Sequence, residues 1–174
     1  FDLLILLDCH ESERIGRCSP LVTKAKEVIA IDHHPSNNLI KNSYTYIDAD
    51  VVSTGVLLYE LFKEKISEMV PQDRKYCAEA VYTTILNDTD NFINRNTDSL
   101  TFKVCSELMN LGLIPGEVAF HFLYSRSAAE MKLLGEVLST ITICEEGQIV
   151  FIHSTLEMLE RNHLGPESTS KIIG

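Results

Sequence analysis

Two apolar runs, each followed at once by an aspartate, constrain the fold of this chain more than any other feature. The first run is Leu3 to Leu7, before Asp8, and the second is Val28 to Ile31, before Asp32. Each is apolar at successive positions, which is typical of a strand buried in a parallel sheet. The chain between them has room for a loop and a short helix near Leu21 to Lys26. We therefore expect a strand, a crossover and a second, parallel strand.

Helical periodicity dominates the next ninety or so residues. It predicts a helix over 54–66 with Ser53 as N-cap, and a second after Pro71, where apolar residues from Cys77 to Leu86 recur at helical spacing up to Asp88. Further helices are predicted for a segment capped by Thr97 and ended by Gly112, for 117–123 and for 128–138. Residues 140–144 and 148–153 flank Gly147 and are predicted to pair as a hairpin. We expect residues 1–139 to form an α/β domain, a parallel β-sheet flanked by helices, and residues 140–174 to begin a second α/β domain. Because the chain enters a strand almost at once, we also expect a strand upstream of Phe1.

The charge balance and the cysteines exclude several classes of protein. There are 15 Lys and Arg residues against 25 Asp and Glu, which argues against a protein that coats duplex DNA. The run Leu3 to Leu7 is far shorter than the ~20 residues that cross a bilayer, so no membrane partner is expected. The five cysteines include no CxxC pair, which fits neither a disulfide framework nor a tetrathiolate zinc site. We therefore expect a reducing compartment, the cytoplasm.

Acidic and histidine side chains gather in three places. They are Asp8, the triplet Asp32-His33-His34 and the triplet Asp88-Thr89-Asp90. The first two follow strands whose carboxyl ends would meet at one edge of the sheet, where ligands bind in open α/β folds. Carboxylates and imidazole without thiolates suit Mn²⁺ or Mg²⁺, and Zn²⁺ or Co²⁺ where the geometry permits. Two ions about 3.5 to 4 Å apart would hold both the attacking and the leaving oxygen of a phosphoryl centre.

The order of these motifs resembles a known family. The segment Ile31-Asp32-His33-His34-Pro35 is similar to the signature of the DHH phosphoesterases, and Leu6-Leu7-Asp8 followed by Arg14 resembles the second motif of that family. The segment Asn87 to Phe92 resembles the fourth motif, and Ser53-Thr54-Gly55 the helix start that commonly precedes it. The later helices look most like the small bacterial members that act as oligoribonuclease and pAp phosphatase.

The resemblance implies a set of metal ligands. Asp8 would bridge two metal ions, His33 would ligate one of them, and Asp88 would complete the set. The expected metal is Mn²⁺, two ions per site, with Mg²⁺ or Co²⁺ as alternatives. His10 has no partner at ligand spacing and is assigned to an ordinary core or surface position.

The resemblance also implies three catalytic side chains. His34 would face the substrate phosphate, Asp32 would orient a histidine and fix its tautomer, and Arg14 would reach a phosphate with its planar guanidinium. A metal-bound hydroxide would then attack the phosphorus of a short single-stranded RNA or of pAp. A second domain of the type called DHHA1 would bind the rest of the substrate, and a homodimer is a further expectation.

Other functions remain open. Within the enzymes of this kind the alternatives are a cyclic-dinucleotide phosphodiesterase, an exopolyphosphatase, a type II inorganic pyrophosphatase or a RecJ-like exonuclease. A non-catalytic nucleotide-binding relative is a further alternative, because the first motif of the family, a His and two Asp, has no match in the chain. Position 90 is Asp where the family usually has Gly. Since Asp tolerates a left-handed backbone, we expect the turn to be kept there.

Overall fold

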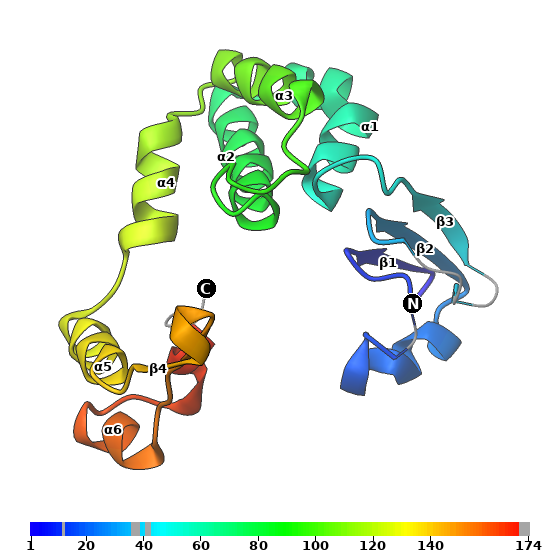
Figure 1. Ribbon diagram of the computed structural model, residues 1–174. Coiled ribbons are helices and arrows are strands. Elements are labelled where there is room, and N and C mark those ends of the chain that lie inside the picture. The colour runs from blue at the N-terminus through cyan, green and yellow to red at the C-terminus, as the bar shows by residue number, and fades with distance from the viewer. Residues whose placement is uncertain (12, 36–38, 41–42, 171–174) are drawn as a thin grey trace. The chain divides into compact units, whose positions relative to one another are not determined.

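The computed structural model describes residues 1–11, 13–35, 39–40 and 43–170. Its first part is a three-stranded sheet in the order β1-β2-β3, and both strand pairs are parallel (Figure 1). The strands are β1 (Leu3–Leu7), β2 (Glu27–Asp32) and β3 (Tyr44–Ile47). A 3₁₀ helix, Gly16–Lys24, lies between β1 and β2 along the chain. The predicted parallel pair with a short helical crossover is therefore confirmed, whereas β3 was not predicted.

The two predicted strands differ in burial. Four of the six residues of β2 are buried, as expected for the central strand of the sheet. In β1 the side chains alternate, and Leu3, Ile5 and Leu7 are each about half exposed. The prediction that both faces of β1 are buried is therefore wrong for the described residues. The physical reason is that Leu3, Ile5 and Leu7 share one face of the strand, and the residues that the structure describes leave this face largely uncovered.

Helices form the larger part of the chain. They are α1 (Thr54–Glu68), α2 (Pro71–Asp88), α3 (Ser99–Asn110), α4 (Pro115–Tyr124) and α5 (Ala128–Leu138). Helix α1 packs against α2 and β2, and α2 also packs against α3 (Figure 1). Their apolar faces share one core, whose fully buried members include Val56, Ile85 and Leu108. This core fixes α1 and α2 relative to each other and so positions the ends of both helices.

The helix ends follow local capping chemistry. The Ser53 hydroxyl accepts a hydrogen bond from the Val56 amide, so the predicted N-cap of α1 is confirmed. The cap of α3 is Asp98 and not Thr97, because the Asp98 carboxylate accepts from the Thr101 amide and a reciprocal capping box forms. Gly112 follows the end of α3 with a φ of 104°, the left-handed backbone that the prediction of a helix stop requires.

Two compact units make up the chain, Phe1–Phe122 and Leu123–Gly174. Besides α5, the second unit contains β4 (Thr142–Cys144), β5 (Ile149–Phe151), α6 (Leu156–Arg161) and 3₁₀ turns at Glu145–Gly147 and Pro166–Thr169. Strands β4 and β5 are antiparallel, which confirms the hairpin. That a second domain begins at residue 140 stays a prediction. None of the helices within the described residues is both long and apolar enough to span a membrane.

Candidate metal centre

Three chain segments end at one place in the first unit. Asp8 follows β1, His33 and His34 follow β2, and Asp88 is the last residue of α2. The Nε2 atom of His33 lies 3.6 Å from Asp8 Oδ1 and 3.7 Å from Asp88 Oδ2. The Nδ1 atom of His34 lies 3.7 Å from the same Asp8 oxygen. The side chains that the sequence singled out thus converge, although they come from positions up to eighty residues apart.

The orientation of the His33 ring suits a metal ligand. Its Nδ1 atom lies 3.3 Å from the Val51 carbonyl oxygen, which can accept a hydrogen bond only if Nδ1 carries the proton. The lone pair of Nε2 then faces the carboxylates of Asp8 and Asp88. Three such electron-rich groups repel one another unless a cation lies among them. Ligand atoms about 2.1 Å from a shared ion lie roughly 3 to 4 Å apart, so the distance from His33 to Asp8 and the distance from His33 to Asp88 each fit a divalent cation. The group whose ligand atoms all lie within 4.8 Å of one another consists of Asp8, Asp32, His33 and His34.

Asp8 is held in an unusual backbone conformation. Its φ is 59°, in the left-handed region that few residues other than glycine adopt. The Asp8 amide donates to the Ile31 carbonyl at 3.0 Å, and the Thr54 hydroxyl donates to Asp8 Oδ1 at 2.8 Å. Such strained residues gather at functional sites, where the surroundings hold them in place. Thr54, which the sequence marked only as a helix start, therefore contributes to the site by anchoring a candidate ligand.

Asp32 is completely buried beneath the two histidines. Its Oδ1 atom accepts hydrogen bonds from the amides of His33 and His34 and from the His34 ring at Nδ1, the last at 2.7 Å. Burial raises the pKa of the Asp32 carboxyl, but its hydrogen bonds with His34 and His10 outweigh this and lower the pKa to about 2. Asp32 is therefore a carboxylate at neutral pH. Its bond to Nδ1 leaves Nε2 as the free nitrogen of His34.

His10 belongs to this candidate site, and sequence reasoning missed it. Its ring is completely buried, and Nδ1 lies 2.5 Å from Asp32 Oδ2. Among the described residues, no hydrogen-bond partner is found for the buried Nε2 atom of His10. The sequence offered no signal for this pair, because His10 and Asp32 are 22 residues apart and neither neighbours the other in any motif.

The two remaining motif positions lie outside this cluster. Arg14 is exposed and makes no ion pair with any residue that the structure describes. Asp90 is also exposed, with a φ of 46°, so the left-handed turn expected at this position is present. The neighbouring Asn91 and Phe92 share that left-handed backbone. The turn therefore forms with a carboxylate where the family usually has Gly.

Comparison with known families agrees with the sequence motifs. Residues 2–85 match the model described as the DHH family, N-terminal domain. This segment contains β1, β2 and most of α2, and with them Asp8 and the Asp32-His33-His34 triplet. The resemblance to the DHH phosphoesterases is therefore confirmed, and so is the α/β fold class with its parallel sheet flanked by helices.

Two relatives share one name, bifunctional oligoribonuclease and PAP phosphatase NrnA. The protein from Bacillus subtilis is 27% identical over 173 residues, which cover 99% of this chain and 53% of the relative. The protein from Thermus thermophilus is 29% identical over 150 residues, covering 86% of this chain and 43% of the relative. The chain thus spans about half the length of these relatives.

Two solved structures share the fold. An exopolyphosphatase-related protein from Bacteroides fragilis matches 99% of this chain and 50% of its own, with a TM-score of 0.84 and 22% identity. A putative family II inorganic pyrophosphatase from Methanococcus jannaschii matches 78% of this chain and 45% of its own, with a TM-score of 0.55 and 22% identity. At this level of identity the likeness concerns the architecture alone.

Proposed function

We propose that the protein containing this chain is a metal-dependent phosphoesterase that hydrolyses short oligoribonucleotides and pAp in the cytoplasm. The observation that carries the proposal is the position of His33 Nε2 between the carboxylates of Asp8 and Asp88, at 3.6 and 3.7 Å. Its other ring nitrogen is directed to the Val51 carbonyl, so Nε2 is available as a ligand. The two relatives named NrnA support the choice of substrates.

In this proposal Asp8, His33 and Asp88 hold the metal, with Mn²⁺ as the expected ion. Two such ions would supply a nucleophilic hydroxide and neutralise charge on the phosphoryl oxygens. The carboxylate of Asp8 has two oxygens and lies next to both histidines, which suits a bridging ligand. The Thr54 hydroxyl keeps this carboxylate oriented by its hydrogen bond to Oδ1.

His34 is proposed to contact the substrate phosphate through Nε2. The Asp32 carboxylate accepts from Nδ1 of this ring, and that bond fixes both the tautomer and the direction in which Nε2 points. The His34 side chain is 37% exposed, so a phosphate can reach it. Arg14, which is exposed, would contact a phosphate of the substrate with its guanidinium.

The test is a turnover assay of the full-length protein with Mn²⁺. The substrates are pAp, di- to pentaribonucleotides, cyclic dinucleotides, polyphosphate and pyrophosphate. We expect hydrolysis of pAp and of the short ribonucleotides, and loss of this activity in Asp8→Ala. The matched control is Asp50→Ala, because Asp50 is an exposed carboxylate outside the cluster. Unchanged turnover in Asp8→Ala, or exclusive hydrolysis of polyphosphate or pyrophosphate, would overturn the proposal.

A further inference from the structure

A pocket opens directly beside two of the candidate metal ligands. It has a volume of about 380 Å³, and Asp8 and Asp88 form part of its wall. Leu7 at the end of β1, Leu58 of α1 and Phe122 of α4 provide apolar surface around it. All of these residues belong to the first compact unit. A group attached to a phosphate at the metal centre would therefore extend into this pocket.

The side chains of the pocket offer no cation to a second phosphate. None of the residues that line it is Lys, Arg or His, and the only charged ones are the carboxylates of Asp8 and Asp88. Beyond the metal ions that Asp8 and Asp88 would hold, a chain of phosphates entering it would meet apolar side chains and no cationic side chain. An uncharged, planar and mostly apolar group loses little hydration free energy on leaving water, and it gains contact with the aromatic ring of Phe122. A nucleobase is such a group.

The polar atoms of the pocket agree with this ligand. The Thr83 hydroxyl donates to the Glu79 carbonyl and the Thr84 hydroxyl donates to the Val81 carbonyl, both at 2.8 Å. Both protons are engaged. The Thr84 oxygen also lies 3.0 Å from the Ser53 hydroxyl, which then donates to it, so of the two the Thr83 oxygen is the acceptor for a ligand. The edge of an aminopurine or of cytosine carries a matching N–H donor.

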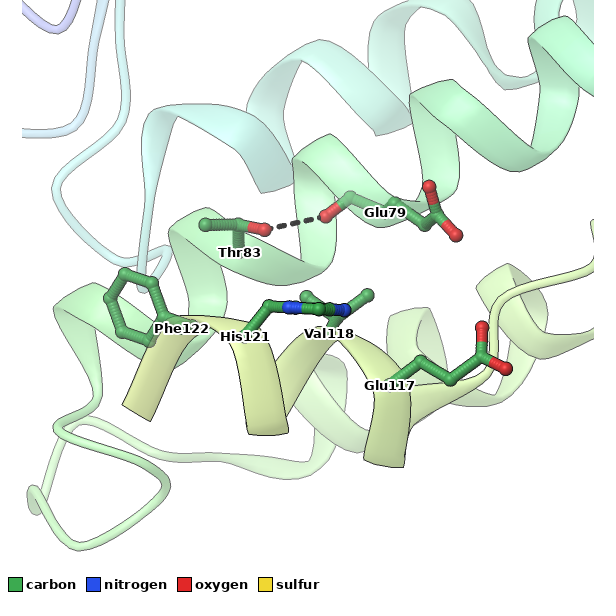
Figure 2. A pocket seen from close by; sticks show the side chains of 6 residues that line it. All are labelled: Glu79, Thr83, Glu117, Val118, His121 and Phe122. Atoms are coloured by element: carbon green, nitrogen blue, oxygen red, sulfur yellow. Dashed lines mark hydrogen bonds between the residues drawn. The ribbon is translucent and has the colours of Figure 1, made fainter. Parts of the chain in front are cut away.

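A second pocket adjoins the first. It has a volume of about 540 Å³ and shares Thr83 and Phe122 with the first. Figure 2 shows these two side chains at one end of the groove between α2 and α4, with Glu79 and Glu117 at the other end. Lys75 Nζ lies 3.5 Å from Glu79 Oε1 and 3.7 Å from Glu117 Oε2. The second pocket thus has a cationic side chain beside its carboxylates, whereas no Lys, Arg or His lines the first.

We propose that the pocket formed by Leu7, Leu58 and Phe122 binds the nucleobase of the nucleotide whose phosphate lies at the metal centre. This inference rests on the proposed function and deepens it, because it assigns the substrate to nucleotides and not to inorganic polyphosphates. Phe122 stacks on the base, and the Thr83 hydroxyl accepts from its amino edge. Phe122 is 41% exposed, so it can be replaced without opening the core.

The experiment measures equilibrium binding of AMP and of ribose 5-phosphate to the full-length, Mn²⁺-loaded protein. The two ligands share a phosphate and a sugar and differ only in the base. We expect AMP to bind roughly 5- to 100-fold more tightly, the range for one base stacked on an aromatic ring. Phe122→Ala should remove most of this preference and leave ribose 5-phosphate binding unchanged. Leu58→Trp, which puts a larger side chain at another lining position of the pocket, should also remove this preference.

Phe120→Ala is the matched control, because Phe120 lies on the same helix, is 61% exposed and lines neither pocket. The Phe120→Ala variant should prefer AMP over ribose 5-phosphate as strongly as the unaltered protein does. Equal binding of the two ligands, binding of neither, or a preference for AMP that survives both Phe122→Ala and Leu58→Trp would overturn the inference. Hydrolysis without a preference for AMP would overturn the inference alone. A preference for AMP without hydrolysis would overturn only the proposed function.

Discussion

Asp32 is a buried carboxylate that accepts four hydrogen bonds, from two backbone amides and two imidazole rings. A carboxylate without such donors would be expensive to bury, and with them it becomes an anchor for both rings. The sequence predicted that Asp32 orients a histidine, and the hydrogen bond to His34 has the geometry that this role needs. The sequence did not predict the hydrogen bond between His10 and the other oxygen of the Asp32 carboxyl group.

The first residue-scale prediction concerns His10. His10→Phe keeps a ring of similar size but leaves Asp32 Oδ2 buried without its donor, so the free energy of unfolding should fall by about 3 kcal/mol. His10→Asn restores an N–H donor near the position of Nδ1 and should recover part of that loss. Unfolding in urea measures both variants. Equal stability of His10→Phe and the unaltered protein would contradict the role given to this pair.

The second residue-scale prediction concerns pH. The pKa of Asp32 is about 2 in the folded protein, below the value of about 3.9 for an unfolded chain. Its ionised form therefore stabilises the fold fully above pH 5, and this contribution is lost as the pH falls from about 4 to about 2. The loss is on the order of 2 kcal/mol.

The measurement for this prediction is the free energy of unfolding at pH 6 and at pH 2.5. Asp32→Asn is the reference, because it retains the shape of the side chain but cannot titrate. The difference in stability between the two proteins should shrink by about 2 kcal/mol at the lower pH. A difference that does not change with pH would show that Asp32 is not charged in the folded protein.

At the scale of elements, a close contact between α1 and α2 sets the position of Thr54. A Cβ atom on Gly55 would overlap the Thr84 hydroxyl, which itself is hydrogen-bonded to the Ser53 hydroxyl at 3.0 Å. Only a glycine lets the first turn of α1 approach α2 this closely. The neighbouring Thr54 is thereby held where its hydroxyl reaches Asp8.

Gly55→Ala should push the two helices apart and lower the free energy of unfolding by about 1 to 3 kcal/mol. The double variant Gly55→Ala/Thr84→Ala removes the obstructing hydroxyl and should be more stable than Gly55→Ala alone. Gly116→Ala is the control, since nothing lies within 4 Å of a Cβ there, and it should be neutral or stabilising. Thermal or urea unfolding of the unaltered protein and of these three variants measures the effect. Equal stability of Gly55→Ala and Gly116→Ala would refute the close contact.

Most elements were predictable where the sequence carries a local signal. Helix α5 has the predicted bounds, and Ser53 caps α1 as expected. The cap of α3 was misplaced by one residue, because Thr97 and Asp98 are both good caps and only the capping box with Thr101 separates them. Strand β3 and helix α6 were missed, since four and six residues are too few for periodicity to stand out.

For the whole molecule, the motifs predicted the candidate site better than they predicted what surrounds it. The carboxyl ends of neighbouring parallel strands lie at the same edge of a sheet, which is why the sequence alone could predict that Asp8 and His33 lie close together. The contacts of Thr54 and Phe122 with this region depend on helix packing, which leaves no mark in the local sequence. The chain also spans about half the length of its NrnA relatives, so the proposed activity belongs to the longer protein.

Asp8, His33 and Asp88 are proposed to hold a divalent metal ion. A crystal structure of the full-length protein grown with Mn²⁺, with anomalous data collected at the manganese edge, tests this assignment. We predict an anomalous peak about 2.0 to 2.3 Å from the Asp8 and Asp88 carboxylates and from His33 Nε2. A structure at saturating Mn²⁺ in which these three side chains hold no ion would contradict the account.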